Sequence, residues 1–341
     1  MRETILTGVR ANEEPTLGNF LGAYVPMVEL AKKYAGEKDV NMFVPDLHSF
    51  TTPIEHEELY GQIIRGVKYY MAAGLPVDSE GVSVYRQSFV SAHSEMAWIL
   101  SCFTGFGEMQ RMTQFKDKSE DLRDSVSVGL FSYPVLMAGD ILLYSAKYVP
   151  VGEDQFQHLE ITRDIAMRMN RKFGEIFTVP VKTAEQVKFM NLDEGLRVRS
   201  LTEPEKKMSK SAENENSKIL LSDKPEVAAK KIMSATTDSV GKIKFDMFNQ
   251  PGVSNLLQIV SLLKGVPLQD VISRWVGETR YGDLKNETAE VVRRFLVEFQ
   301  EKVAAISDDD VLKVLEQGEE RARVKAGAKL LEVQKVLGLR R

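Results

Sequence analysis

Short apolar runs alternate with amphipathic segments through the first part of this chain, and this alternation strongly limits how it can fold. The apolar runs lie at 5–9, 42–44, 82–85 and 148–151, and segments with helical periodicity lie at 18–34, 57–73, 94–103 and 155–170. Such alternation predicts an α/β fold, a parallel sheet with helices on both faces. Ligands of these sheets bind where strands end and helices begin, so we expect a site at that edge.

The second part of the chain reads as nearly all helix. Helices are expected at 225–233, 254–263, 287–303 and 308–337, with the last one broken at Gly318. A chain of 341 residues is long for one domain, so its length suggests two.

Composition narrows the classes of function. The net charge of −4 gives no global positive field, so any nucleic acid must meet locally gathered cations. The single cysteine, Cys102, excludes a disulfide framework and a multi-cysteine zinc or iron–sulfur site, and we expect it to be buried in a helix. The start of the sequence has no apolar signal region, and Asp140 interrupts the most hydrophobic stretch, which favours a cytoplasmic protein without a membrane span.

Two short motifs point to ATP chemistry. The string KMSKS at 207–211 places two ammonium groups on a polar loop that could close over a triphosphate. A defined string of this length arises by chance about once in a few million positions, although a solvated basic loop is an alternative. Upstream, Thr16-Leu17-Gly18-Asn19 joins a strand to a helix, whose first amide groups favour an anion. An ordinary strand-to-helix turn is the alternative for this second motif.

These motifs resemble a known family. Thr16 to Asn19 resembles the first signature of class I aminoacyl-tRNA synthetases in its bacterial tryptophanyl form, and KMSKS resembles the second signature. Further similar stretches follow in the same order at 46–48, 111–116, 133–144, 149–155 with His158, and 252–257. The resemblance spans roughly residues 5–339. It implies that L-tryptophan, ATP and tRNA(Trp) are the substrates and that tryptophanyl-adenylate is the intermediate.

The resemblance also implies a domain plan. Residues 1–203 would form a Rossmann-like catalytic domain, with a helical insertion at about 88–143 that contributes much of a homodimer interface. Residues 204–216 would form the KMSKS loop. Residues 217–341 would form a helical anticodon-binding domain, with the terminal helix packing back on the catalytic domain. Lysines and arginines of that helix read singly as a solvated face, but as a set they could meet phosphate.

Activation of an amino acid by ATP needs positioned charge more than a protein nucleophile. The resemblance makes Lys207, Lys210 and Lys118 the catalytic side chains. The residues expected to bind ATP are Arg10, Thr16, Gly18, Asn19, Gly152, Asp154, Lys207, Met208, Ser209 and Lys210. Magnesium would be held through the ATP phosphates, because the sequence shows no dedicated carboxylate cage, and no zinc or iron–sulfur cluster is expected.

Asp140 is the clue to the amino acid. A lone carboxylate on an apolar helix is costly unless a donor satisfies it, and an indole N–H is a suitable donor. A backbone amide or a lysine is the alternative partner. The resemblance assigns Asp140 to the indole nitrogen, and it assigns the rest of the tryptophan site to Leu6, His48, Tyr133, Met137, Val149, Val151 and Gln155.

The chain departs from the family just before the first motif. Arg10 stands where a glutamine is usual, and residues 11–13 lack the usual Pro-Ser-Gly or Pro-Thr-Gly. Arg10 could pair with Glu13 or Glu14, or it could reach the ATP phosphates, which we favour. Two rival functions remain open from sequence: a tyrosyl-tRNA synthetase, and a synthetase-like paralogue that binds tRNA or tryptophan without charging.

Overall fold

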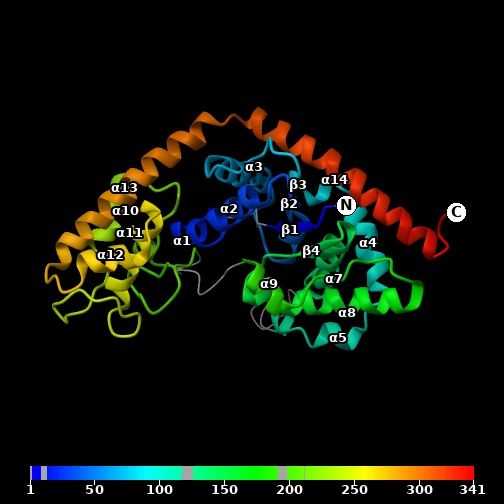
Figure 1. Ribbon diagram of the computed structural model, residues 1–341, viewed down its shortest axis with the longest axis horizontal. Coiled ribbons are helices and arrows are strands. Elements are labelled where there is room, and N and C mark those ends of the chain that lie inside the picture. Colours follow the sequence, from blue (N-terminus) through cyan, green and yellow to red (C-terminus); the bar gives the residue numbers. More distant parts are fainter. Residues whose placement is uncertain (1, 9–13, 117–125, 191–197, 211) are drawn as a thin grey trace.

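A parallel sheet forms the centre of the first part of the chain (Figure 1). The computed structural model describes residues 2–8, 14–116, 126–190, 198–210 and 212–341. The strands are β1 (Thr4–Gly8), β2 (Asp39–Val44), β3 (Val82–Arg86) and β4 (Ala146–Tyr148), in the order β3-β2-β1-β4. Successive side chains of a strand face opposite sides. Both sides are buried here, because Ile5 and Val40 belong to one core while Leu6 and Phe43 belong to the other. The predicted α/β fold is confirmed.

Helices connect the strands and cover both faces of the sheet. Between β1 and β2 lie α1 (Leu17–Asn19), the π-helical turn η1 (Phe20–Tyr24) and α2 (Val25–Tyr34). Between β2 and β3 lie η2 (Leu47–Thr51) and α3 (His56–Ala72). Between β3 and β4 lie η3 (Gln87–Phe89), α4 (Ala92–Ser101), α5 (Phe106–Gln110) and α7 (Val128–Leu143). After β4 come η5 (Glu153–Gln155), α8 (Phe156–Phe173) and α9 (Thr183–Met190).

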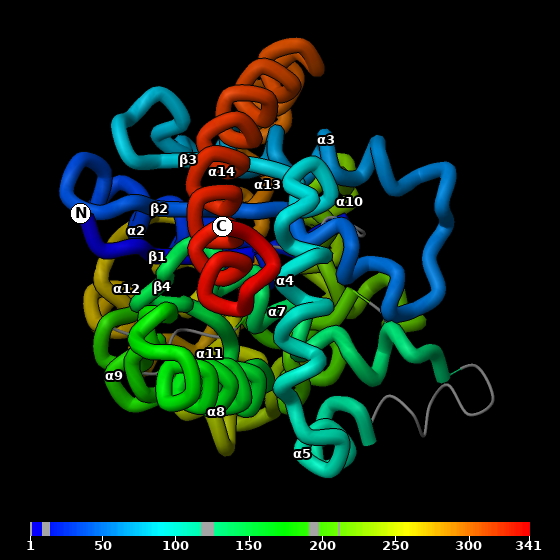
Figure 2. The backbone as a smooth tube through the Cα atoms, turned by 90° about the vertical axis from the view of Figure 1, so that its right-hand side faces the viewer, coloured from blue at the N-terminus to red at the C-terminus, as the bar shows by residue number. Residues whose placement is uncertain are grey.

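The second part of the described chain is helical, as expected. A short turn, η6 (Glu215–Ser217), precedes α10 (Pro225–Met233), α11 (Pro251–Lys264), α12 (Leu268–Trp275), α13 (Tyr281–Ala305) and α14 (Asp308–Val336). In Figure 1, α10 to α12 gather at one end of the molecule, and α13 and α14 form an arch that leads from them to the sheet. The view in Figure 2 shows α14 crossing beside β3 and α4, with which it is in contact.

The expected break of the last helix at Gly318 is wrong, because α14 continues through this residue. A Cβ atom built on Gly318 would lie 1.8 Å from the carbonyl oxygen of Val84 in β3. The glycine therefore permits close packing of the helix on the edge strand of the sheet, and it does not interrupt the helix.

Cys102 also differs from expectation, since it is exposed at the end of α4. Its backbone N–H donates to the preceding turn, so it closes the helix and packs into no core. Among the described helices, none is long and apolar enough to cross a membrane.

Candidate active site

The residues expected to hold an amino acid line one cavity at the carboxyl edge of the sheet. It has a volume of about 340 Å³. Its lining includes every residue predicted for the tryptophan site: Leu6, His48, Tyr133, Met137, Asp140, Val149, Val151 and Gln155. They come from the strand β1, the helix α7 and the segments that follow β2 and β4. Because all these strands are parallel, the segments that follow them meet at one edge, which brings distant parts of the sequence together.

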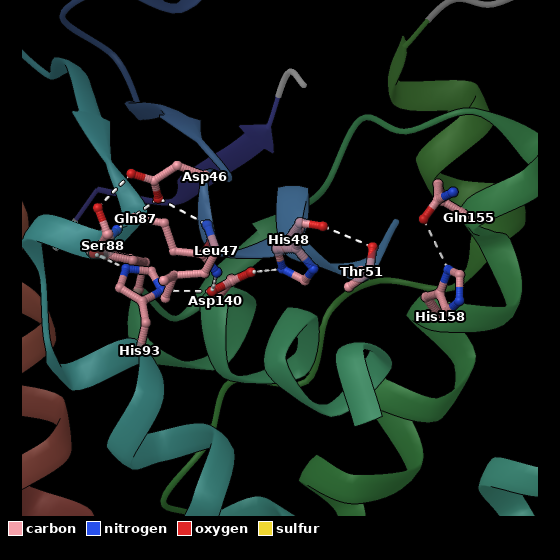
Figure 3. Close-up of polar contacts among 11 residues, drawn as sticks. Asp46, Leu47, His48, Thr51, Gln87, Ser88, His93, Asp140, Gln155 and His158 are labelled. Atoms are coloured by element: carbon pink, nitrogen blue, oxygen red, sulfur yellow. Dashed lines mark hydrogen bonds and ion pairs between the residues drawn. The ribbon is translucent and has the colours of Figure 1, made fainter. Parts of the chain in front are cut away.

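Asp140 is fully buried and accepts three side-chain hydrogen bonds (Figure 3). His48 donates from Nε2 to Oδ2 over 2.8 Å. On the other oxygen, His93 Nδ1 lies at 2.6 Å and Gln87 Nε2 at 2.7 Å. Burial raises the pKa of Asp140, but the hydrogen bonds from His48 and His93 outweigh it and lower the pKa to about 2. The carboxylate is therefore ionised at neutral pH. Among the described residues, its partners are therefore neither a backbone amide nor a lysine, the two alternatives expected.

The protonation of His93 follows from its two contacts. Its Nδ1 must carry the proton that it donates to ionised Asp140. Its Nε2 lies 2.9 Å from the hydroxyl of Tyr144, which donates to it when the ring is neutral. His93 thus has a hydrogen-bond partner at each of its ring nitrogens.

A second chain of hydrogen bonds forms another wall of the cavity. The Nδ1 of His158 lies 2.9 Å from Oε1 of Gln155, and its Nε2 lies 2.9 Å from the hydroxyl of Tyr133. The amide nitrogen of Gln155 donates to Asp154 over 2.6 Å. His158 therefore links Tyr133 of α7 to Gln155, and both of these residues line the cavity. This arrangement suits a cationic group of a ligand.

The first motif forms a reciprocal cap at the start of α1. The backbone N–H of Asn19 donates to the Thr16 hydroxyl oxygen, and Asn19 Oδ1 accepts from the backbone and side chain of Thr16 at 3.1 and 2.9 Å. These contacts fix the strand-to-helix turn. Thr16 is completely buried, so its side chain has this local structural role.

The two motifs are in direct contact. A Cβ atom on Gly18 would lie 3.3 Å from the Cβ of Met208, which is itself buried. Just after the second motif, Leu220 pairs with Thr16 in a β-bridge, and the Leu17 N–H donates to the carbonyl of Ile219 over 2.7 Å. Packing at Met208 therefore holds the KMSKS segment against the first motif, and the later residues Ile219 and Leu220 add backbone pairing.

A second cavity, of about 450 Å³, lies where these motifs meet α3. Its lining includes Glu14, Pro15, Arg65, Tyr69, Lys210, Lys218 and Leu220. Glu14 accepts from the Tyr69 hydroxyl over 2.6 Å and pairs with Arg65 at 3.4 Å. Lys210 and the first motif thus border one polar space.

The other residues expected to bind ATP lie in different parts of the structure. Lys207 and Ser209 are exposed on the KMSKS segment. Gly152 and Asp154 lie at the start of η5, beside the first cavity, which Asp154 lines. Arg10 and Lys118 lie outside the described residues.

Sequence reasoning missed several supporting residues. Gln87 and His93 hold Asp140 from behind the cavity. Lys218 donates to the carbonyls of Lys210 and Ala212 at 2.8 and 2.9 Å, which secures the end of the KMSKS segment. Asn255 forms two hydrogen bonds with the backbone of Arg199, which precedes that segment. The similar stretch at 252–257 was the only signal for Asn255, and it did not indicate a role.

Some cations of the last helix form ion pairs with carboxylates of the protein. On α14, Lys325 pairs with Asp39, Lys329 with Glu332, and Arg323 with Glu320. These three cations of the expected basic set are therefore engaged within the protein. Within the described part of the chain, no group of three His, Cys, Asp or Glu side chains is placed to hold a metal ion.

The geometry agrees with comparisons to known proteins. Residues 2–297 match the family of class I tRNA synthetases (W and Y). The chain is 47% identical over 335 residues to a tryptophan–tRNA ligase of Caldanaerobacter subterraneus, covering 98% of each chain. It is 41% identical over 344 residues to that of Bacillus subtilis, covering 100% of this chain and 99% of the relative.

Solved structures give the same result. The tryptophanyl-tRNA synthetase of Mycoplasma pneumoniae superimposes with a TM-score of 0.82 at 37% identity, covering 99% of this chain and 98% of that one. The Campylobacter jejuni enzyme, complexed with ADP and tryptophan, gives 0.80 at 30% identity, covering 98% and 99%.

Proposed function

The chain belongs to the class I tRNA synthetases of the W and Y family, and from this membership we propose that it is a tryptophan–tRNA ligase. It activates L-tryptophan with ATP to tryptophanyl-adenylate and pyrophosphate. It then transfers the tryptophanyl group to the terminal adenosine of tRNA(Trp) and releases AMP.

One observation carries the choice of amino acid: ionised Asp140 borders a cavity that the apolar side chains of Leu6, Met137, Val149 and Val151 also line. Each carboxylate oxygen can accept about two hydrogen bonds. Oδ1 already accepts from Gln87 and His93, whereas Oδ2 accepts from His48. Oδ2 therefore retains capacity for one further donor, and the indole N–H of tryptophan supplies it. The ring would lie against Leu6, Met137, Val149 and Val151.

The ammonium group of the substrate would lie at the other wall. Tyr133 and Gln155, which His158 links by hydrogen bonds, both line the cavity there. The side-chain oxygens of Tyr133 and Gln155 suit a cation. With the ammonium group there, the substrate carboxylate would point toward the nucleotide. This orientation is required because a carboxylate oxygen must attack the α-phosphorus of ATP.

ATP would bind between the two motifs. The contacts fall to Asn19, Gly152, Asp154 and the segment from Lys207 to Lys210, while buried Thr16 and Gly18 shape the turn that presents Asn19. Arg10 and Lys118 complete the set in this proposal. Lysines placed at the leaving pyrophosphate stabilise the charge that develops there, which is the main task of the protein in this reaction.

Magnesium would arrive bound to the ATP phosphates and would neutralise part of their charge. The residues around the site agree with binding through the phosphates, because Mg²⁺ needs few protein ligands when phosphate oxygens and water supply the rest. Asp154, a carboxylate of η5, lines the first cavity.

The partners follow from the same assignment. The helical region from α10 to α13 would bind the anticodon part of tRNA(Trp), and the reaction would take place in the cytoplasm. Large apolar side chains are exposed on α4, α5 and α7, where Trp98, Phe106 and Val128 are 73%, 66% and 81% exposed. We assign this face to a homodimer interface, because apolar patches of this kind mark contact surfaces.

Aminoacylation of tRNA(Trp) tests the function against its rivals. The chain should charge this tRNA with tryptophan and should not charge tRNA(Tyr) with tyrosine. A tyrosyl enzyme would do the reverse. A non-charging paralogue would bind tRNA or tryptophan and form no aminoacyl-tRNA.

A further inference from the structure

A buried ion pair joins the last helix to the edge strand of the sheet. Glu319 of α14 and Arg86 at the end of β3 meet through two contacts, Nε to Oε1 at 2.6 Å and Nη2 to Oε2 at 3.2 Å. Their side chains are only 2% and 5% exposed. A two-point contact between a guanidinium and a carboxylate fixes orientation as well as distance.

The pair lies at the open side of β3. In the sheet formed by the described residues, β3 is the outer strand and pairs with β2 alone. On that side, Ser88 donates its backbone N–H to Asp46 over 2.9 Å. On the other side, Glu319 holds Arg86, and Gly318 lets the helix approach the carbonyl of Val84. Two separate contacts therefore clamp the end of β3.

The residue after Arg86 is a direct partner of Asp140. Gln87 is fully buried and donates to Oδ1 of Asp140 over 2.7 Å. Within the described part of the chain, Oε1 of Gln87 accepts no hydrogen bond. Among the described residues, Asp140 is thus the one hydrogen-bond partner of the Gln87 side chain. The position of this side chain therefore depends on the backbone at the end of β3.

We propose that Glu319 and Arg86 are positioning residues for tryptophan recognition, acting through Gln87 on Asp140. The ion pair sets the end of β3, this end places the Gln87 amide, and the amide fixes the carboxylate that receives the indole N–H. A helix of the C-terminal region thereby contributes to a pocket that none of its residues lines. This inference rests on the proposed function.

Tryptophan-dependent pyrophosphate exchange tests the proposal with Glu319→Gln. This variant keeps the size of the side chain but leaves Arg86 without its charged partner. Displacement of a positioned group by about 1 Å can lower the reaction rate by about 100-fold, and we expect a smaller effect from a change that acts indirectly. We expect the KM for tryptophan to rise about 10-fold, with the KM for ATP unchanged. Arg86→Lys keeps the positive charge without the two-point contact, and it replaces Glu319→Gln if that variant does not fold.

Two readouts separate positioning from a merely structural role. First, the effect should be absent with β-(3-benzothienyl)alanine, in which sulfur replaces the indole N–H. Second, Glu319→Gln combined with Gln87→Ala should raise the KM for tryptophan no further than Gln87→Ala alone, because both changes act on one path. The matched control is Lys325→Met, which removes the exposed pair between α14 and Asp39 but has no route to Gln87.

An equal loss for both amino acids, or effects of Glu319→Gln and Gln87→Ala that multiply, would overturn the inference. An unchanged KM for tryptophan in the folded variant would do the same. Failure of the proposed function looks different, since the parent protein itself would then show no exchange with tryptophan.

Discussion

At the scale of single residues, we propose that Asp140 decides which side chain the cavity accepts. Its burial and its apolar neighbours in sequence were enough to single it out. Its donors could not be predicted, because Gln87 and His93 lie on other elements and only the fold brings them to the carboxylate. For the same reason, the contacts of His158 with Tyr133 and Gln155 could not be predicted, because Tyr133 lies on another helix.

Asp140→Asn should weaken selection for the indole ring. The amide has nearly the same volume, but it carries no charge, and its NH₂ group would face histidine donors. Sites built to pair a buried donor reject analogues without it by up to about 10⁴-fold. We therefore expect the ratio of kcat/KM for tryptophan to kcat/KM for phenylalanine to fall by up to about 10⁴-fold, as measured by pyrophosphate exchange. A ratio as high as that of the parent would place the indole contact elsewhere.

Lys210→Ala should slow activation and leave tryptophan binding nearly intact. Removal of one positioned donor in a transition state commonly costs about 100- to 1,000-fold in rate. Rapid-quench measurement of adenylate formation checks the rate, and Lys206→Ala is the control, since Lys206 is exposed and pairs with Glu203 at 2.7 Å. An unchanged rate in Lys210→Ala would remove this lysine from the mechanism.

At the scale of elements, the strands and most helices could be predicted from hydrophobic periodicity. The reason is that a strand buried on both faces appears as a run of apolar residues, and a helix buried along one stripe appears as a periodic apolar pattern. Gly318 shows the limit of this approach. Its neighbour is the carbonyl of Val84, far away in sequence, so a glycine needed for close packing reads as a helix breaker.

Gly318→Ala should destabilise the protein, although alanine is the better helix former. The added Cβ would meet Val84 at 1.8 Å, so α14 or β3 must move. Overpacking of this kind costs about 1–3 kcal/mol and occasionally more. Gly327→Ala, on the same helix with nothing within 4 Å of its Cβ, should raise the unfolding free energy by up to about 1 kcal/mol. Equal stabilities of the two variants in urea unfolding would contradict this packing account.

At the scale of the whole molecule, the two motifs meet although a large part of the chain separates them. The sequence suggested their partnership through family resemblance. The contact itself, Gly18 against Met208 with Leu220 paired to Thr16, is a product of the fold. Supports such as Asn255 and Lys218 stayed hidden because they bind backbone atoms, which leave no pattern in the sequence.

The molecule should be a dimer that a charge on its apolar face disrupts. Trp98→Asp places an ion where the proposed interface excludes water, so sedimentation at micromolar concentration should show the parent as a dimer and this variant as a monomer. Tyr60→Asp is the control, because Tyr60 is 56% exposed on α3, outside this face. A monomeric parent would refute the assignment of the interface.

Pyrophosphate exchange with each of the twenty amino acids in turn tests the central claim most directly. It needs only ATP and one amino acid, so it reports on the cavity and the two motifs without any contribution from tRNA. The account predicts rapid exchange with tryptophan and exchange near background with tyrosine, phenylalanine and the others. Exchange that is faster with tyrosine than with tryptophan, or absent with every amino acid, would contradict it.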